Sequence, residues 1–137
     1  MHLNELVKDI VQDPSDIPKI EINNICTHSG QAQNGSLFVA IYGKKFDGHD
    51  FIKKAVENGA SAISVLTDEP FFGGRLEYIS EVKSVIDIPV LRKDFIISDY
   101  QIWESYYAGA DAILLIADVL EKNQMYRLYA VSYTHLR

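Results

Sequence analysis

The stretch that decides the fold class is GASAISVLT, residues 59–67, where a glycine ends a helical pattern and a continuous apolar run begins about two residues later. The stretch GADAI, residues 109–113, repeats this arrangement. Glycine tolerates the left-handed conformation that commonly ends a helix, and a short apolar run between turn signals is typical of a buried strand. The two stretches therefore form a weak internal repeat of helix, glycine and strand.

Working outward from these stretches, strands and helices are predicted to alternate. The expected strands cover residues 20–25, 37–42, 62–67, 90–92 and 112–116, and the expected helices cover residues 3–11, 50–58, 76–86 and 99–108, with one more from about residue 121. Ser98 and Gln101 have the spacing of a capping box at the start of a helix. Apolar strands that alternate with helices are typical of a parallel sheet covered on both faces, in a barrel or in an open sheet.

Composition narrows the class of function. With 137 residues the chain has room for one ordinary domain, or for two fragments that each lack a full core. The net charge of -6 and the lack of a Lys or Arg cluster argue against nucleic acid or an anionic membrane as partner. A single cysteine and a start without signal-peptide character predict a cytoplasmic protein, and the four scattered histidines predict neither a metal nor a cofactor.

Lys93 is the main candidate for chemistry. It follows the apolar run of residues 89–91 and precedes Asp94, at the predicted carboxyl end of a strand, where function collects in parallel sheets. Partial loss of water disfavours a charged amine, which suits a general acid, a base or a Schiff-base amine. The alternative is an ion pair with Asp94 or Glu69, the commoner situation of a lysine at a strand end.

Residues 59–130 resemble the indole-3-glycerol phosphate synthases, tryptophan-pathway enzymes with a (β/α)8 barrel. The resemblance rests on GASAISVLTDE (59–69), FFGG (71–74), VLRKDFII (90–97), YQI (100–102) and residues 108–117. It implies that the segment supplies barrel strands two to four, and that Lys93 protonates the substrate ketone oxygen during ring closure, before decarboxylation and dehydration. It also implies that Phe72, Phe95 and Leu114 line an apolar pocket for the anthranilate ring of a phosphorylated substrate; ordinary core packing is the alternative for these three.

Residues 1–60 resemble a different family, the N-terminal domain of the UDP-N-acetylmuramoyl-tripeptide synthetases, which are Mur ligases of peptidoglycan synthesis. The resemblance rests on SLFVAI (36–41), Gly43 and DGHDFI (47–52). It implies a small α/β nucleotide-binding-like segment whose contacts with uridine and diphosphate come from Thr27, Ser29, Lys44, Lys45 and Phe46. The usual Asp-Ser-Arg is His-Ser-Gly at residues 28–30, which loses both charges, and the chain has no Gly-x-x-x-x-Gly-Lys-Ser/Thr loop for ATP. Ligase activity is therefore excluded.

The two resemblances divide the chain into a Mur-ligase-like segment (1–60), a partial synthase barrel (61–131) and an unstructured tail (132–137). A change of family within one reading frame favours a chimera, and the last residues resemble translated adapter sequence. Since the synthase family needs a first strand with a glutamate and a second lysine, we expect the fragment to be inactive alone, and to self-associate through open sheet edges. Three hypotheses stay open: a lyase, a UDP-binding module, and a fragment without activity.

Overall fold

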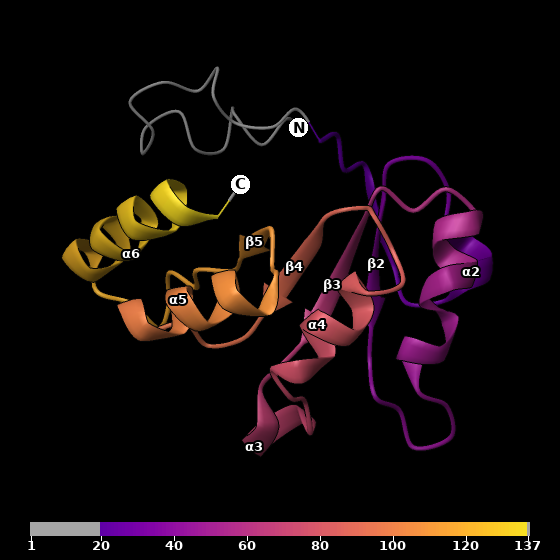
Figure 1. Cartoon of the computed structure of the whole chain (residues 1–137), viewed down its shortest axis with the longest axis horizontal. Helices are drawn as coiled ribbons and strands as arrows, with labels where there is room; N and C mark the ends of the chain where they lie inside the picture. The colour runs from indigo at the N-terminus through magenta and orange to yellow at the C-terminus, as the bar shows by residue number, and fades with distance from the viewer. Residues whose placement is uncertain (1–19, 137) are drawn as a thin grey trace.

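A five-stranded parallel sheet organises the protein. The computed structural model describes residues 20–136, and the strands lie side by side in chain order (Figure 1). They are β1 Asn24–Cys26, β2 Ser36–Ala40, β3 Ala62–Leu66, β4 Val90–Lys93 and β5 Ala112–Ile113. Strands in unbroken order are the arrangement of a (β/α)8 barrel, whereas doubly wound sheets reverse their order at a switch point. The predicted α/β class with a parallel sheet is confirmed, and its strand order is consistent with a partial barrel.

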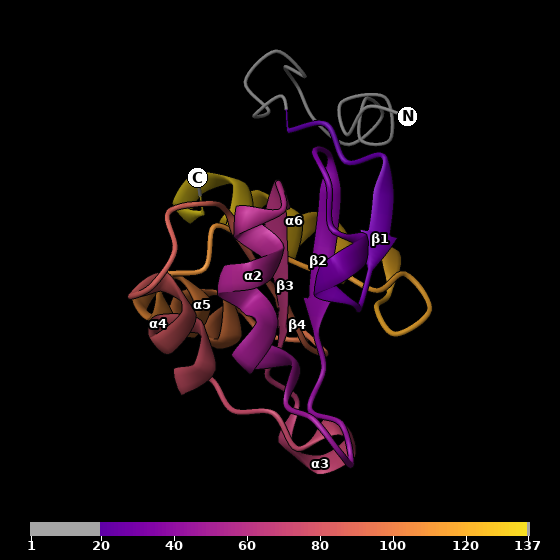
Figure 2. The same ribbon diagram turned by 90° about the vertical axis from the view of Figure 1, so that its right-hand side faces the viewer.

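Helices connect the strands and cover one side of the sheet. Figure 2 shows α2, α4 and α5 on the same side of the strands. The helical elements are η2 Ser29–Gln31, η3 Gly48–Phe51, α2 Ile52–Glu57, α3 Glu69–Phe72, α4 Glu77–Lys83, α5 Asp99–Ala108 and α6 Lys122–His135. Among the helices of residues 20–136, none is both long enough and apolar enough to cross a bilayer.

The hydrophobic core lies between the sheet and these helices. Phe38 from β2, Ile63 from β3 and Val90 from β4 are fully buried against Ala55 of α2 and Ile79 of α4. A second, smaller cluster joins α5 to α6 through buried residues that include Ile102 and Leu128. Side chains alternate between the two faces of a strand, so the residues next to those core positions face the other side of the sheet.

The predicted repeat of helix, glycine and strand is confirmed. Gly59 and Gly109 have φ values of +102° and +94°, which a residue with a Cβ adopts only with strain. Two residues later, Ser61 Oγ accepts a hydrogen bond from the backbone N–H of Gly35 at 2.8 Å. Asp111 Oδ2 likewise accepts from the N–H of Val90 at 2.8 Å. In both repeats, the side chain two residues after the glycine forms a hydrogen bond that links the following strand to the start of the strand before it.

Element boundaries differ from prediction where the sheet ends. The expected strand over residues 20–25 is only Asn24–Cys26, and the expected strand over residues 112–116 is only Ala112–Ile113. β1 and β5 are the edge strands of the described sheet, each paired with one neighbour, so half of their backbone groups have no ladder partner. The helix predicted over residues 3–11 lies outside the residues that the structure describes.

The prediction that residues 132–137 form an unstructured tail is wrong for most of these residues. Helix α6 continues through His135, and the N–H of Leu136 still donates to the carbonyl oxygen of Ser132 at 2.8 Å. Val131 and Leu136 pack against the cluster of α5 and α6. This tertiary packing extends a helix whose last residues have no helical pattern of their own.

Residues on both sides of position 60 belong to one sheet and one core. Leu37 of β2 is in register with Ala62 of β3, and the pairing continues to Ala40 and Val65. The side chain of Asn58 also donates to the carbonyl oxygen of Ser29 at 2.8 Å. The two segments of the chain therefore pack against each other through continuous strand pairing.

Candidate functional site

Polar and aromatic residues gather where β3 and β4 end. β3 is followed by Thr67 and Asp68, and both of these are buried. β4 ends at Lys93, which lies opposite Leu66 in the parallel register. The carbonyl oxygen of Lys93 accepts a hydrogen bond from the N–H of Thr67 at 3.2 Å, which extends the pairing by one step. The carboxyl ends of the two strands are thereby held together at the edge where parallel sheets place their sites.

The amine of Lys93 lies over an aromatic ring. Its Nζ atom is 5.3 Å from the centroid of the Phe72 ring, which comes from α3 after the neighbouring strand. Lys93 is half-buried, while Phe72 is 47% exposed, so the pair opens toward solvent. A cation over a ring face is attracted by the ring quadrupole, so Phe72 holds the amine without neutralising it.

The alternative for Lys93, an ion pair with Asp94 or Glu69, is wrong. Among residues 20–136 the Lys93 ammonium forms no salt bridge, and the Asp94 carboxylate is bound by Arg92 instead, at 2.9 Å. Neighbouring residues of a strand point to opposite faces. Arg92 is buried on the helix side, so Lys93 faces the other side and cannot share its neighbour's partner.

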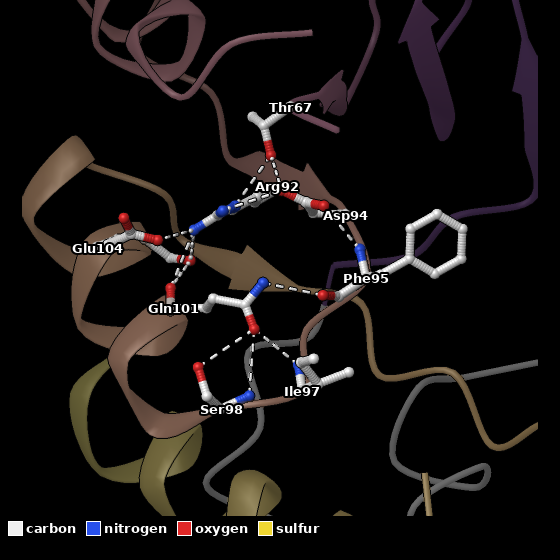
Figure 3. Close-up of polar contacts among 9 residues, drawn as sticks. Thr67, Arg92, Asp94, Phe95, Ile97, Ser98, Gln101 and Glu104 are labelled. Atoms are coloured by element: carbon white, nitrogen blue, oxygen red, sulfur yellow. Dashed lines mark hydrogen bonds and ion pairs between the residues drawn. The ribbon is translucent and has the colours of Figure 1, made fainter. Parts of the chain in front are cut away.

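Arg92 is the centre of a buried polar network. It is 4% exposed, and its Nε donates to Thr67 Oγ1 at 2.9 Å while one terminal nitrogen donates to Asp94 Oδ2 at 2.9 Å. The hydroxyl of Thr67 in turn donates to the same Asp94 oxygen at 2.6 Å. Figure 3 shows these three side chains converging beside β4. The network therefore joins the end of β3 to the end of β4.

The other side of the guanidinium reaches helix α5. Its second terminal nitrogen donates to the carbonyl oxygen of Gln101 and to Ser105 Oγ, both at 3.0 Å. Glu104 Oε2 lies 3.6 Å from the same nitrogen (Figure 3). A buried guanidinium is costly unless its donors are bound, and here every nitrogen has a partner. The strand end and the helix are thus fixed to each other.

Asp94 is held in its charged form. Burial alone would raise the pKa of this carboxyl, but the hydrogen bonds from Thr67 and Arg92 favour the carboxylate, and the net pKa lies below its ordinary value. The other carboxylate oxygen accepts from the N–H of Phe95 at 2.8 Å. Asp94 therefore fixes the backbone of Phe95, near the start of the loop that follows Lys93.

The loop after Lys93 is closed by the predicted helix start at residue 99, which is confirmed. The amide oxygen of Gln101 accepts from the N–H groups of Ile97 and Ser98 at 2.8 and 3.1 Å. Its amide nitrogen donates to the carbonyl oxygen of Phe95 at 2.9 Å. One side chain thus holds three backbone groups of the loop (Figure 3).

The sequence model of the indole-3-glycerol phosphate synthase family matches residues 41–135, which is more than half of the chain. The chain belongs to the indole-3-glycerol phosphate synthase family. The match takes in the alternating strands and helices from β3 to α6 and the Lys93 motif, and it begins upstream of the boundary expected at residue 60. Membership places the chain in a family of tryptophan biosynthesis.

Curated relatives carry the family name. The indole-3-glycerol phosphate synthase of Rhodopirellula baltica is 44% identical over 95 residues, covering 69% of this chain and 37% of that protein. That of Endomicrobium trichonymphae is 42% identical over 113 residues, covering 82% of this chain and 42% of that protein. The chain therefore spans less than half the length of these relatives. The solved structure of a mandelate oxidase mutant with (S)-mandelic acid is similar at a TM-score of 0.46 and 19% identity, covering 57% of this chain and 31% of that structure.

The residues expected to line the synthase's apolar pocket lie at the carboxyl end of the sheet. Phe72 lies under the Lys93 amine. Phe95 is 37% exposed, and its ring contacts Phe71 edge to face at a centroid distance of 6.0 Å. Figure 3 shows the Phe95 ring pointing away from the Arg92 network. Leu114 is half-buried just after β5, and its N–H donates to the carbonyl oxygen of Arg92 at 3.3 Å.

The residues expected to contact a uridine nucleotide lie on two loops that follow β1 and β2. Ser29 is buried in η2, whereas Thr27 is exposed. Lys44, Lys45 and Phe46 are exposed in the loop after β2, where the Phe46 ring contacts Phe51 at a centroid distance of 6.4 Å. The comparisons with known proteins give no support to a Mur-ligase segment.

The sequence reasoning missed Arg92 and its partners. An arginine inside an otherwise apolar strand is itself a signal, because arginine is almost never buried unless it is paired. Its partners come from 25 and 13 residues away, at Thr67 and Ser105, so the sequence alone does not indicate them. Within the described part of the chain, no three His, Cys, Asp or Glu side chains gather in a way that would hold a metal ion.

Proposed function

We propose that this chain carries part of the catalytic site of an indole-3-glycerol phosphate synthase, with Lys93 as general acid. In the family's reaction, the ring of a carboxyphenylamino-deoxyribulose phosphate closes, with loss of carbon dioxide and water. The observation that supports this role is the Lys93 amine at the carboxyl end of β4, which lies 5.3 Å above the Phe72 ring and has no carboxylate partner among residues 20–136. An amine in that position can give its proton to a ketone oxygen as negative charge develops there.

The aromatic side chains around Lys93 fit the other half of such a substrate. Phe72, in α3 after β3, and Phe95, in the loop after β4, are partly exposed, and Leu114 follows β5. Partly exposed apolar side chains can cover an aryl ring that enters from solvent, and so they suit an anthranilate moiety. Binding the ring there would place the carbonyl carbon that it attacks within reach of the Lys93 amine.

We infer that the chain alone does not complete the reaction. A general acid supplies only part of a rate enhancement that depends on oriented partner groups. The family places a glutamate and a second lysine on another strand, and the chain spans less than half of its curated relatives. We therefore expect the isolated chain to form no measurable indole-3-glycerol phosphate.

Grafting the segment into a full-length relative tests the role of Lys93. Residues 61–131 would replace the matching segment of the Rhodopirellula baltica synthase, and turnover would be followed by the fluorescence of the indole product. We expect activity in the graft and a loss of about 100-fold or more on Lys93→Met, since general acids contribute at least that much. Lys122→Met, at an exposed lysine of α6, is the matched control. A folded graft that is inactive with Lys93 in place, or active without it, would contradict the proposal.

A second candidate function is binding of a uridine nucleotide by the first segment. The observation that favours it is the pair of exposed lysines, Lys44 and Lys45, on the loop after β2, at the same end of the sheet as Ser29 after β1. Titration calorimetry with UDP tests this function. Binding that weakens on Lys44→Gln and Lys45→Gln would support it, and the absence of heat at millimolar UDP would reject it.

A further inference from the structure

A stripe of exposed aromatic side chains follows one face of helix α5. Tyr100, Trp103 and Tyr107 are spaced three and four residues apart, so they lie above one another on the helix. They are 71%, 38% and 80% exposed. Large aromatic side chains gathered on a protein surface are a common feature of binding sites.

The stripe forms one wall of a groove between α4 and α5. The groove has a volume of about 460 Å³, and its opposite wall includes Leu76 and Glu77 at the start of α4. Glu104 of α5 also lines it. The groove therefore combines three aromatic rings with two carboxylates. None of the residues proposed to contact the synthase substrate lines it.

The charge of the groove is negative. Among residues 20–136, no basic side chain lines it. Arg75 lies over the Tyr78 ring at 4.7 Å, and Lys83 pairs with Asp111 at 2.9 Å. The His135 ring of α6 packs on the Trp103 ring at a centroid distance of 4.1 Å. Glu104 is partly neutralised by Arg92 at 3.6 Å. Glu77 is exposed, and within residues 20–136 it forms no salt bridge.

We propose that this groove binds a small organic cation with an alkylated ammonium group. Ring faces attract cations, most strongly when the cation sheds its water, and an alkylated ammonium sheds water more readily than a metal ion does. Trp103 and Tyr107 supply ring faces, and Glu77 supplies the opposite charge. The volume of the groove leaves room for a substituent on the nitrogen.

Trp103 reports on binding directly, because it is the only tryptophan in the chain. The full chain would be titrated with tetramethylammonium chloride at constant ionic strength, and Trp103 fluorescence and its indole N–H signal in NMR spectra would be recorded. We expect a saturable change with tetramethylammonium and none with tert-butanol, a neutral molecule of similar shape. Each of Tyr107→Leu and Glu77→Gln should weaken binding about two- to fivefold, the effect of one exposed cation–π or charge contact.

Tyr42→Leu is the matched control, since Tyr42 is 61% exposed and lies outside the groove. It should leave the titration unchanged. The proposal would be overturned by a linear response to tetramethylammonium, by an equal response to tert-butanol, or by an equal loss in the Tyr42→Leu chain. The indole N–H signal keeps the test valid for each variant, because its position shows whether that variant retains the native surroundings of Trp103.

Discussion

Replacing Arg92 with methionine should be among the most destabilising single changes in the described part of the protein. Methionine keeps the unbranched apolar stem of arginine but is shorter, and it removes every donor of the guanidinium. Thr67, Asp94 and Ser105 each lose a hydrogen bond. The Asp94 carboxylate, whose side chain is 11% exposed, would keep a hydroxyl and a backbone N–H but no positive charge.

The size of the effect follows from burial. Removing one partner of a buried ion pair leaves the other charge uncompensated, which costs roughly 3–5 kcal/mol. The Arg92 side chain is 5% exposed, so the pair is close to the buried limit, and we expect about 3 kcal/mol for Arg92→Met. Domains of this size are stable by roughly 5–15 kcal/mol, so the loss is a large share of the total.

Urea unfolding followed by Trp103 fluorescence and far-UV circular dichroism measures this loss. The control is Arg127→Met, because Arg127 is 71% exposed in its pair with Asp99 and should contribute less than about 1 kcal/mol. The double variant Arg92→Met with Asp94→Leu removes both charges. It should be more stable than Arg92→Met alone, because no buried charge is left without a partner.

The reasoning would be refuted if Arg92→Met cost no more than Arg127→Met. It would also be refuted if adding Asp94→Leu to Arg92→Met lowered the unfolding free energy by as much as Asp94→Leu lowers it in the native chain. Either outcome would mean that the guanidinium is not the element that holds the strand ends to helix α5. Unchanged slopes of the urea transition are needed for both comparisons, since a changed slope would indicate an altered unfolded state.

Three further predictions concern pH, backbone strain and assembly. Because folding lowers the pKa of Asp94, its charged form stabilises the protein above the unfolded pKa of about 3.9, and this stabilisation is lost as the pH falls through the lower folded pKa. The difference in unfolding free energy between the native chain and Asp94→Asn should therefore shrink from pH 6 to pH 2. A difference that stays constant over this range would argue against the Arg92–Asp94 pair. Gly109→Ala should cost about 1–2 kcal/mol in urea unfolding, and more than Gly73→Ala, because φ is +94° at Gly109 but +65° at Gly73, near the left-handed region that other residues can reach. The chain should self-associate through its edge strands, and sedimentation at rising concentration should show dimers or larger species; a monomer at all concentrations would contradict this.

The sequence predicted best those features that are set by nearby residues. Helix α5 begins and ends where it was expected, because Gln101 holds the loop before it and Gly109 ends it. Strand lengths at the sheet edges were predicted less well, because pairing there depends on neighbours that the local sequence does not specify. The end of α6 was missed for the same reason, since its last turn is held by packing of Val131 and Leu136 against other elements.

The side chain of Lys93 shows how a buried charge, Arg92, can determine the face of the strand on which a neighbouring charge lies. From the sequence alone, either Arg92 or Lys93 could form an ion pair with Asp94. Burying Arg92 against Thr67 and helix α5 fixes which face of β4 each side chain occupies, and the pleat then sends Lys93 to the opposite face, over Phe72. Asp94 pairs with Arg92 on the buried side, so within residues 20–136 the Lys93 amine has no acidic partner. The arginine and the aspartate therefore act together: their ion pair stabilises the strand end, and it leaves the Lys93 amine available for the substrate that we propose.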